Sequence, residues 1–288
     1  MSRGKLLQGI PVASKILMEA KALVEKLKSE RGVTPCLATI LVGDDPASAT
    51  YVSMKGKRCE SVGAKPLAIH LPSSTTTQQL LAKIDELNND KSVHGILLQH
   101  PVPPQIDERL CMDRISIAKD VDGVTSHSFG RFTFGIQGAW GCATPYGIMR
   151  ILDFYKVKTS GCHAVVVGRS TILGKPMAMM LLGADATVTV CHSKTKDLAE
   201  HVKRADIVVA AVGKPRFIKG EWIKQGAVVV DAGYNEGNVG DVDFDAALSV
   251  SSMITPVPGG VGPVTIATLI DQGVRAADFQ SSLATAKR

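Results

Sequence analysis

The first half of the chain alternates between two kinds of apolar pattern. Apolar residues at helical spacing predict helices over residues 11–30 and 75–90. Short runs rich in Val, Ile and Leu predict buried strands at 36–43, 66–71 and 93–99. Strands and helices therefore take turns along this half, separated by polar or proline-containing loops.

The second half resumes this alternation after a predicted helix at 145–158. Strands are predicted at residues 163–168, 186–191, 206–213, 226–233 and 252–257. Helices are predicted over 175–183 and 196–204. Short Val-rich strands that alternate with helices are typical of parallel sheets covered on both faces. The predicted fold class is therefore α/β, with two α/β units.

Length and composition are those of a soluble protein with two domains. The chain has 288 residues, of which 45% are hydrophobic and 21% charged. No apolar run is long enough to span a bilayer, and the N-terminus lacks the apolar core of a secretory signal. The six cysteines form no Cys-x-x-Cys pair, which argues against a structural metal and suits a reducing compartment. We therefore expect a cytoplasmic protein without a membrane anchor or metal; a mitochondrial location stays open.

The positive charge of the chain permits an anionic partner. Its formal net charge is +6 at pH 7, but the basic residues are dispersed and only 5% of residues are aromatic. These features argue against nucleic acid. A small polyanion, such as a phosphorylated cofactor, fits the mild excess of positive charge.

The stretch VVVGRSTILGKPMA, residues 165–178, follows a predicted strand and opens a predicted helix. The phosphates of a dinucleotide bind at such a turn. Gly168 allows a tight turn, Gly174 allows close backbone approach, and Pro176 suits a first helical turn. The spacing is not Gly-x-Gly-x-x-Gly, so an ordinary strand-to-helix turn remains an alternative interpretation.

The next predicted strand favours NADP over NAD. NAD-binding units usually carry an acidic residue at its end for the ribose hydroxyls. Here the strand ends with His192, Ser193 and Lys194, and Arg169 follows the first glycine. An arginine, a hydroxyl and nearby basic groups can hold a 2′-phosphate, and no carboxylate repels it.

Tyr51 and Lys55 are four residues apart and would share one face of a helix. Two interpretations are open for this pair on spacing alone. It is either part of an active site or an aromatic ring resting on the stem of a surface lysine.

Several stretches together resemble one family. They are GDDPASATYVSMK, GILLQHPVP, KDVDGVT, VVGRSTILGKPMA, ATVTVCHSKT and TPVPGGVGPVT. In this order they resemble the bifunctional methylenetetrahydrofolate dehydrogenase/methenyltetrahydrofolate cyclohydrolase family, over about residues 9–277. The resemblance implies two α/β domains around a cleft, the second a Rossmann-type dinucleotide-binding domain. Residues 1–144 would form the catalytic folate-binding domain, completed by a C-terminal helix at about 265–288, and residues 145–264 the NADP-binding domain.

The resemblance also implies roles for individual residues of the first domain. Lys55 matches the catalytic lysine, Tyr51 the tyrosine that stacks on the substrate, and Gln99 the glutamine beside the lysine. Ser48 matches a serine of the same loop, and Asp122 the aspartate that holds the pterin.

For the second domain the resemblance implies cofactor contacts and a closing loop. The implied cofactor-binding residues are Gly168, Arg169, Ser170, Gly174, His192 and Ser193, with Arg169 and Ser193 at the 2′-phosphate. The loop over nicotinamide and folate would contain Gly259, Gly260 and Pro263. Family members are usually homodimers through this domain, so we expect a homodimer that binds folate and takes part in one-carbon metabolism and purine biosynthesis.

One stretch departs from the family pattern. The family usually reads Pro-Cys-Thr-Pro before the crossing helix, whereas this chain has Cys142 and Ala143 ahead of Thr144 and Pro145. A role for the usual cysteine therefore does not carry over to Ala143.

The two reactions make different demands on the residues. Oxidation of the methylene bridge removes a hydride from a carbon flanked by two nitrogens, so it needs positioning more than acid–base help. Hydrolysis of the methenyl cation needs a group that moves protons near neutral pH. Burial and a cationic substrate lower the pKa of a lysine, and Gln99 would orient Lys55 without adding negative charge. This reasoning favours the active-site interpretation of Tyr51 and Lys55.

Three rival functions differ from this one in a specific feature. A shikimate-type dehydrogenase would need an aspartate partnered with its lysine, where this chain offers Gln99. A hydrolase with a vestigial cofactor domain would not need Arg169 and Ser193. A non-enzymatic dinucleotide sensor would have no use for Tyr51, Lys55 and Gln99 together.

Overall fold

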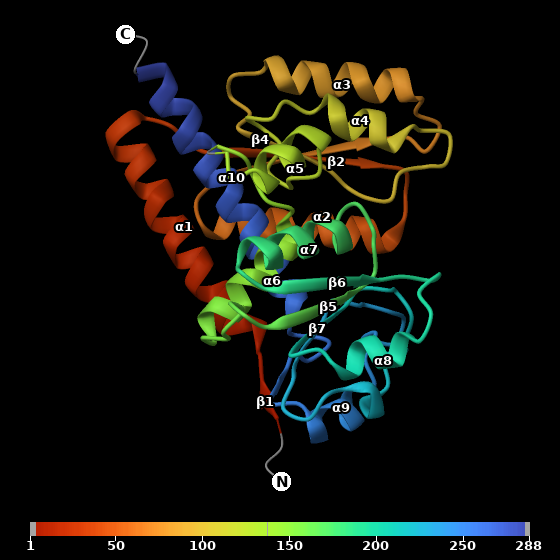
Figure 1. The fold of residues 1–288 in the computed structure, drawn as a ribbon. Helices are drawn as coiled ribbons and strands as arrows, with labels where there is room; N and C mark the ends of the chain where they lie inside the picture. Colours follow the sequence, from red (N-terminus) through yellow and green to blue (C-terminus); the bar gives the residue numbers. More distant parts are fainter. Residues whose placement is uncertain (1–3, 137, 286–288) are drawn as a thin grey trace. The chain divides into compact units, whose positions relative to one another are not determined.

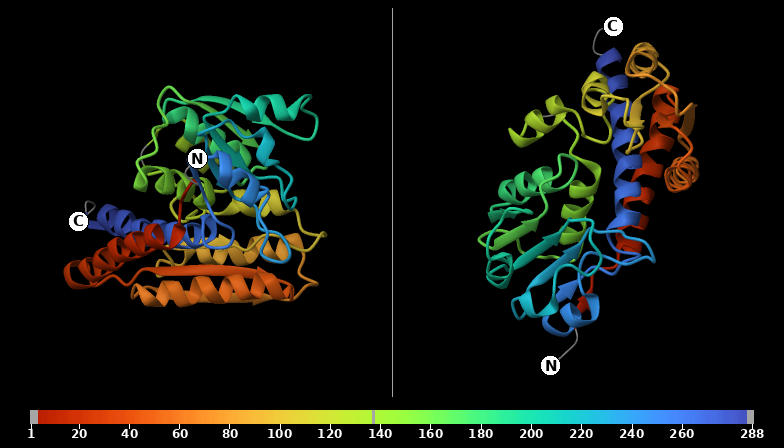
Figure 2. Two further views of the ribbon diagram at one scale, coloured as in Figure 1. Left: turned by 90° about the horizontal axis from the view of Figure 1, so that it is seen from below. Right: turned by 90° about the vertical axis from the view of Figure 1, so that its right-hand side faces the viewer.

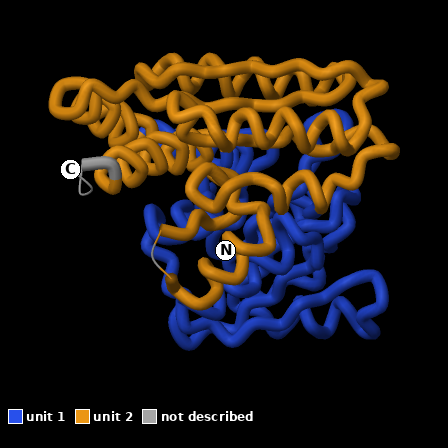
Figure 3. The backbone as a smooth tube through the Cα atoms, turned by 90° about the horizontal axis from the view of Figure 1, so that it is seen from above, with its two compact units in different colours: residues 1–14, 144–265 blue, residues 15–143, 266–288 orange. Residues whose placement is uncertain are grey.

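The chain forms two compact units in the computed structural model, which describes residues 4–136 and 138–285. Unit 1 comprises residues 1–14 and 144–265, and unit 2 comprises residues 15–143 and 266–288 (Figure 3). The family resemblance implies a single domain for residues 1–144, completed by the C-terminal helix. In the structure the first fourteen residues group with unit 1, because β1 (Lys5–Leu6) pairs with β9 (Met253–Ile254).

Unit 2 is built on a parallel three-stranded sheet of order β3-β2-β4. The strands are β2 (Cys36–Val42), β3 (Lys65–Leu71) and β4 (Gly95–Leu98). Helix α2 (Pro46–Ser61) covers one face, and α3 (Thr77–Asn89) covers the other (Figures 1 and 2). The connection from β2 to β3 and the connection from β3 to β4 run in opposite directions across the sheet. Because both are right-handed crossovers, they place their helices on opposite faces.

The core of unit 2 lies between the sheet and three helices. Helices α1 (Gly9–Arg31) and α10 (Val261–Thr285) contribute to it together with α2. Buried residues of this core include Val24 and Leu27 of α1 and Val274 of α10. Two short helices, α4 (Glu108–Arg114) and α5 (Ser126–Thr133), have no counterpart in the predicted pattern.

Unit 1 contains a parallel six-stranded sheet of order β1-β9-β8-β7-β5-β6. Its other strands are β5 (His163–Val167), β6 (Thr187–Cys191), β7 (Ile207–Ala210) and β8 (Val228–Asp231). The chain runs from β5 to β6 on one side and then returns to β7 on the other side of β5. A topological switch point therefore lies between β5 and β7, where α/β sheets bind ligands at the carboxyl ends of their strands.

Helices cover both faces of this sheet. Helix α7 (Gly174–Gly183) lies on one face, and α8 (Leu198–Lys203) and α9 (Phe244–Val250) lie on the other (Figure 1). The short 3-10 helix η1 (Gly220–Trp222) contacts α8 and α9, and α6 (Ala143–Phe154) leads into the unit. Every second strand residue joins the core on the α8 and α9 side, as Val165 and Val167 of β5 do.

Two further observations concern the described residues. No helix among them is both long enough and apolar enough to cross a bilayer. All six cysteines lie within the described chain as free thiols, five of them buried and Cys162 partly exposed.

Candidate active site

Helix α2 positions the Tyr51–Lys55 pair. The Asp45 carboxylate accepts a hydrogen bond from the Ser48 backbone N–H (2.7 Å) and caps the helix. Pro46 is the first helical residue, where its missing N–H costs nothing. Tyr51 is 36% exposed, and Lys55 is partly buried one turn further along.

Lys55 meets the glutamine predicted to lie beside it. Its Nζ donates a hydrogen bond to Gln99 Oε1 (2.9 Å), and Gln99 follows directly after β4. The amide nitrogen of Gln99 donates to the backbone carbonyl of His100 (2.8 Å), which keeps the amide oxygen turned toward the ammonium group. Lys55 therefore has an oriented but uncharged partner.

Asp122 is the charged group that acts on Lys55. Burial lowers the pKa of Lys55, and the negative charge of Asp122 opposes that shift. Burial also raises the pKa of Asp122 to about 6, and the positive charge of Lys55 works against that rise. A small cavity along the Lys55 side chain is lined mainly by apolar residues, including Leu37, Leu97 and Leu269. These apolar surroundings account for the lowered pKa of Lys55.

The loop that carries Asp122 is fixed by its neighbours. Asp120 is fully buried, and its carboxylate accepts hydrogen bonds from the N–H groups of Val124 (3.1 Å) and Thr125 (2.9 Å). This is the loop-capping role that the DVDG sequence suits. The backbone N–H of Ala143 donates to the Asp122 carbonyl (3.1 Å). Asp122 can then project its side chain from a rigid loop.

Two residues without a predicted site role, Gln272 and Cys142, complete this support. Gln272 of α10 is 2% exposed, and its amide nitrogen donates to the carbonyls of Val121 (2.8 Å) and Gly141 (3.0 Å). The Cys142 thiol donates to the Gly123 carbonyl (2.8 Å). No sequence pattern distinguishes a buried glutamine within a long helix, so only the structure identifies Gln272.

In unit 1 the predicted cofactor turn lies at the switch point, after β5. Gly168 has φ +134°, and a Cβ there would lie 2.1 Å from the Ala211 carbonyl oxygen. A Cβ on Gly174 would lie 2.3 Å from the Gly168 carbonyl oxygen. Both glycines are therefore required by close packing of the turn. Arg169 and Ser170 are exposed, and Ser170 Oγ accepts from the Gly174 N–H (3.3 Å).

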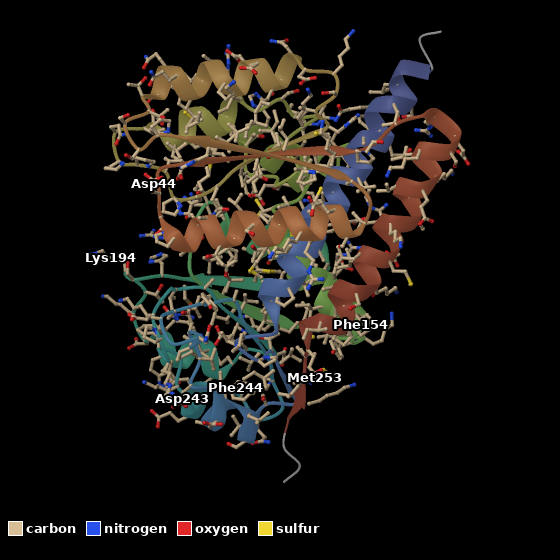
Figure 4. All side chains as sticks on the ribbon, turned by 180° about the vertical axis from the view of Figure 1, so that it is seen from behind. Asp44, Phe154, Lys194, Asp243, Phe244 and Met253 are labelled. Carbon is tan, nitrogen blue, oxygen red and sulfur yellow. The ribbon has the colours of Figure 1, made fainter. Side chains whose placement is uncertain are left out.

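The turn after β6 lies next to it at the same edge of the sheet. Val167 is paired with Cys191, and the Gly168 N–H donates to the Cys191 carbonyl (2.9 Å). His192 shapes this turn, because its Nδ1 accepts from the Lys194 N–H (3.1 Å). Ser193 and Lys194 are exposed, and Figure 4 labels Lys194 in this turn.

These two turns fit a phosphorylated dinucleotide. Exposed arginine and serine side chains stand on neighbouring turns, next to the start of α7. A strand-to-helix turn with nearby cationic and hydroxyl groups suits phosphate.

The predicted closing loop follows β9 in unit 1. Gly259 has φ +97°, a backbone conformation that favours glycine, and its carbonyl accepts from the Gly9 N–H (2.8 Å). A Cβ on Gly260 would lie 2.4 Å from the Pro256 carbonyl oxygen. Pro263 lies in the first turn of α10, where proline is tolerated.

Family models match most of the chain. The tetrahydrofolate dehydrogenase/cyclohydrolase catalytic domain matches residues 7–122, and the NAD(P)-binding domain of the same family matches residues 142–281. The chain is also similar to the bifunctional protein FolD of Saccharophagus degradans. The two are 62% identical over 272 residues, which cover 94% of this chain and 97% of that protein.

The chain belongs to the tetrahydrofolate dehydrogenase/cyclohydrolase family. This finding confirms the resemblance read from the sequence, the α/β fold class and the enzyme class. As a family member, the chain is an enzyme with a tetrahydrofolate dehydrogenase/cyclohydrolase catalytic domain and an NAD(P)-binding domain.

Solved structures of the family have the same fold. The bifunctional enzyme FolD of Campylobacter jejuni is similar with a TM-score of 0.93 and 46% identity, over 96% of this chain and 99% of that chain. The Trypanosoma brucei methylenetetrahydrofolate dehydrogenase-cyclohydrolase, solved with NADP cofactor and an inhibitor, also has a TM-score of 0.93. It is 35% identical, over 97% of this chain and 99% of that chain.

Proposed function

We propose that this chain oxidises 5,10-methylenetetrahydrofolate with NADP and hydrolyses the methenyl product to 10-formyltetrahydrofolate. The observation that carries the proposal is the 2.9 Å hydrogen bond from Lys55 Nζ to Gln99 Oε1, with the charge of Asp122 acting on the same lysine. The bifunctional relatives support it. The proposed catalytic residues are Lys55, Gln99 and Tyr51.

For the hydride transfer, the chain supplies binding and orientation. NADP, when bound, supplies the hydride acceptor. A nitrogen lone pair of the substrate stabilises the developing cation, so no side chain has to remove a proton in this step. Tyr51 offers a flat, partly exposed ring for the aminobenzoyl group, and Ser48 lies one turn before it on α2.

For the hydrolysis, Lys55 moves the protons. Water must lose a proton as it attacks the methenyl carbon, and the departing ring nitrogen must gain one. Burial lowers the pKa of Lys55, and the cationic substrate would lower it further. Gln99 holds the lysine in place without a negative charge, so the neutral amine remains accessible.

Asp122 binds the pterin in this proposal. A carboxylate can accept two parallel N–H bonds from the amino-pyrimidine edge. Its loop is fixed by Asp120, Gln272 and the Ala143 N–H, so the carboxylate is pre-positioned.

The choice of NADP rests on the turns after β5 and β6. Exposed Arg169 and Ser193 would hold the 2′-phosphate, with Gly168, Ser170, Gly174 and His192 forming the two turns. Gly259 and Gly260 form the loop that we assign to nicotinamide and folate, and Pro263 lies in the first turn of α10 directly after it. The Trypanosoma brucei relative, solved with NADP cofactor, supports NADP as the dinucleotide.

We further propose a homodimer located in the cytoplasm. Strand β6 is the terminal strand of the six-stranded sheet, and Val190 on it is 37% exposed. Such a strand offers backbone groups for pairing with a second copy. The free cysteines suit a reducing compartment. Light scattering during size-exclusion chromatography should give twice the chain mass of 30.5 kDa.

Absorbance assays test the proposed activities. With methylenetetrahydrofolate, the purified enzyme should reduce NADP much faster than NAD, and added methenyltetrahydrofolate should decay at its own absorption band. Shikimate is the control substrate. Reduction of NADP with shikimate but not with the folate, or the absence of either folate reaction, would contradict the proposal.

A further inference from the structure

Two buried aspartates lie outside every residue assigned so far. Asp231 ends β8 and is 2% exposed, and Asp241 follows in the next loop and is fully buried. Buried carboxylates are costly unless hydrogen-bonded, so their partners indicate what they do.

Asp241 gathers three consecutive backbone N–H groups. Its carboxylate accepts from Val212 (2.6 Å), Gly213 (2.9 Å) and Lys214 (2.9 Å). It also accepts from the Asn235 side-chain amide (3.0 Å). Successive N–H groups that converge in this way form an anion-binding concavity. In this chain the concavity is filled by the protein's own carboxylate.

Asp231 holds the segment that carries Asp241. One of its oxygens accepts from the N–H groups of Gly233 (2.9 Å) and Asp241 (2.9 Å). The other accepts from the Val242 N–H (2.9 Å). The end of β8 therefore fixes Asp241, and Asp241 fixes residues 212–214.

Two glycines give the carboxylates the space to approach. A Cβ on Gly240 would lie 2.0 Å from an Asp231 carboxylate oxygen, and a Cβ on Gly233 would lie 2.2 Å from an Asp241 carboxylate oxygen. Asp231 thus packs against Gly240, which precedes Asp241. Asp241 packs against Gly233, which lies two residues after Asp231. Real Cβ atoms do not come so close, so any side chain at either position would displace a carboxylate.

The segment that Asp241 holds lies at the switch point. Residues 212–214 follow β7, which is paired with β5, and Ala211 contacts Gly168 of the proposed phosphate turn. The carboxyl ends of these two strands are where an α/β sheet binds its dinucleotide.

We infer that Asp241 is a positioning residue for the dinucleotide, which holds residues 212–214 in the conformation that the bound cofactor contacts. This inference rests on the proposed function, because it takes the cofactor site to be at the carboxyl ends of β5 and β7. Asp231 sets the position of Asp241. Loss of the Asp241 carboxylate frees three N–H groups and loosens the cofactor site, while Lys55, Gln99 and Asp122 belong to unit 2 and are unaffected.

Calorimetric titration with NADP and a cyclohydrolase assay without NADP test the inference. In Asp241→Ala, the Kd of NADP should rise about ten- to a hundredfold, because several charge-assisted hydrogen bonds are lost. Hydrolysis of methenyltetrahydrofolate should stay within about twofold of the parent. Asp245→Ala removes an exposed carboxylate of the same segment and should leave both readouts unchanged. An unchanged Kd in a folded Asp241→Ala would overturn the inference, as would an equal loss of both readouts.

Two further variants make the test independent of that substitution. Asp241→Asn keeps the size of the side chain but turns an amide toward N–H donors, so it should also weaken NADP binding. If neither variant at Asp241 folds, the residue is structural and the inference is overturned. A Cβ on Gly233 would also lie 2.7 Å from the Asp241 backbone nitrogen, a contact that remains in Asp241→Ala. Gly233→Ala should therefore weaken NADP binding in the parent and have a smaller additional effect in Asp241→Ala, where only the clash with the carboxylate is relieved. Additive losses would show that the glycine and the aspartate act separately. A failure of the proposed function itself would appear in the unsubstituted enzyme, as no NADP binding or no hydrolysis.

Discussion

Lys55 combines an apolar environment with an uncharged hydrogen-bond partner. Its Nζ donates to Gln99 Oε1, and burial lowers its pKa. A lysine held by a carboxylate alone would keep its proton more firmly, because a nearby negative charge favours the ammonium form. The glutamine at this position therefore suits the proton transfer that we propose for Lys55 near neutral pH.

Replacing Lys55 with methionine should separate the two reactions. Methionine is similar in length but does not ionise, so hydrolysis should fall by about 10²- to 10⁴-fold, the usual effect of losing a general acid–base group. Oxidation needs Lys55 only for positioning, so part of it should survive. Methenyltetrahydrofolate should accumulate, which is measured as a rise at its absorption band without enzymatic decay. Parental hydrolysis by the folded variant, verified by circular dichroism, would remove Lys55 from the proton-transfer role.

Asp122 should make folate binding depend on pH. Burial raises its pKa to about 6, so the carboxylate takes up a proton as the pH falls through that value. The protonated group no longer accepts two N–H bonds, and the Kd of folate should increase below about pH 6. Calorimetric titration with folate from pH 5 to 8 measures this effect. Asp122→Asn should bind weakly at every pH, and a pH break that persisted in this variant would assign the titration to another group.

At the residue scale, the sequence predicted the side chains that we propose to carry the chemistry, but not those that hold them. The spacing of Tyr51 and Lys55 predicted a shared helix face, and α2 provides it. Gln272 and Asp241 could not be predicted, because the backbone groups that they bind are more than twenty residues away in sequence.

Helix α10 contains two glutamines that offer a matched comparison. Gln272 donates to the Val121 and Gly141 carbonyls, next to Asp122. Two turns later, Gln280 donates to the carbonyls of His94 (2.8 Å) and Ala118 (2.9 Å). The same chemistry therefore operates once beside the proposed pterin site and once away from it.

Each glutamine should contribute to stability, but only Gln272 to folate binding. Gln272→Leu leaves carbonyl groups without their donor and should lower the free energy of unfolding by about 1–3 kcal/mol. It should also raise the KM for folate in both reactions, because the loop of Asp122 loosens. Gln280→Leu should lower stability comparably and leave the KM unchanged. Urea denaturation and steady-state kinetics measure both effects, and equal KM changes in the two variants would indicate general loosening of unit 2.

Among the elements, the strands with strong apolar patterns were predicted most closely. The run at 36–43 corresponds to Cys36–Val42, and that at 163–168 to His163–Val167. The run at 206–213 is shorter in the structure, because β7 ends at Ala210, just before the contact of Ala211 with Gly168. Strand β1 was not predicted, since two residues are too short to form a recognisable pattern.

For the whole molecule, cofactor binding should add to the free energy of unfolding. A ligand at a hundred times its Kd stabilises the folded state by about 2.7 kcal/mol. NADP should therefore raise the melting temperature more than NAD at equal concentration.

In Arg169→Ala, the Kd of NADP should rise about ten- to a hundredfold and the advantage of NADP over NAD should disappear. Equal losses for NADP and NAD would place Arg169 at the pyrophosphate or in the fold instead.

The grouping of the first fourteen residues is a property of the whole molecule that the sequence did not reveal. Helix α1 begins in unit 1 and continues in unit 2, so the apolar pattern of one helix spans a unit boundary. The spacing of apolar residues shows that this stretch is a helix. It does not show that the two ends of the helix belong to different units, because the spacing is the same at both ends. The pairing of β1 with β9 joins residues almost 250 positions apart, beyond the reach of any local pattern.

The distribution of the cysteines makes the enzyme suitable for labelling at one position. Five thiols are buried, and burial raises the pKa of Cys36, Cys59, Cys111, Cys142 and Cys191. Because the thiolate is the reactive form, a maleimide dye should attach to partly exposed Cys162 of the native enzyme. Intact mass should show one dye per chain, and none in Cys162→Ser. Mixing donor-labelled with acceptor-labelled enzyme would then reveal, by energy transfer, whether two chains associate and how fast they exchange.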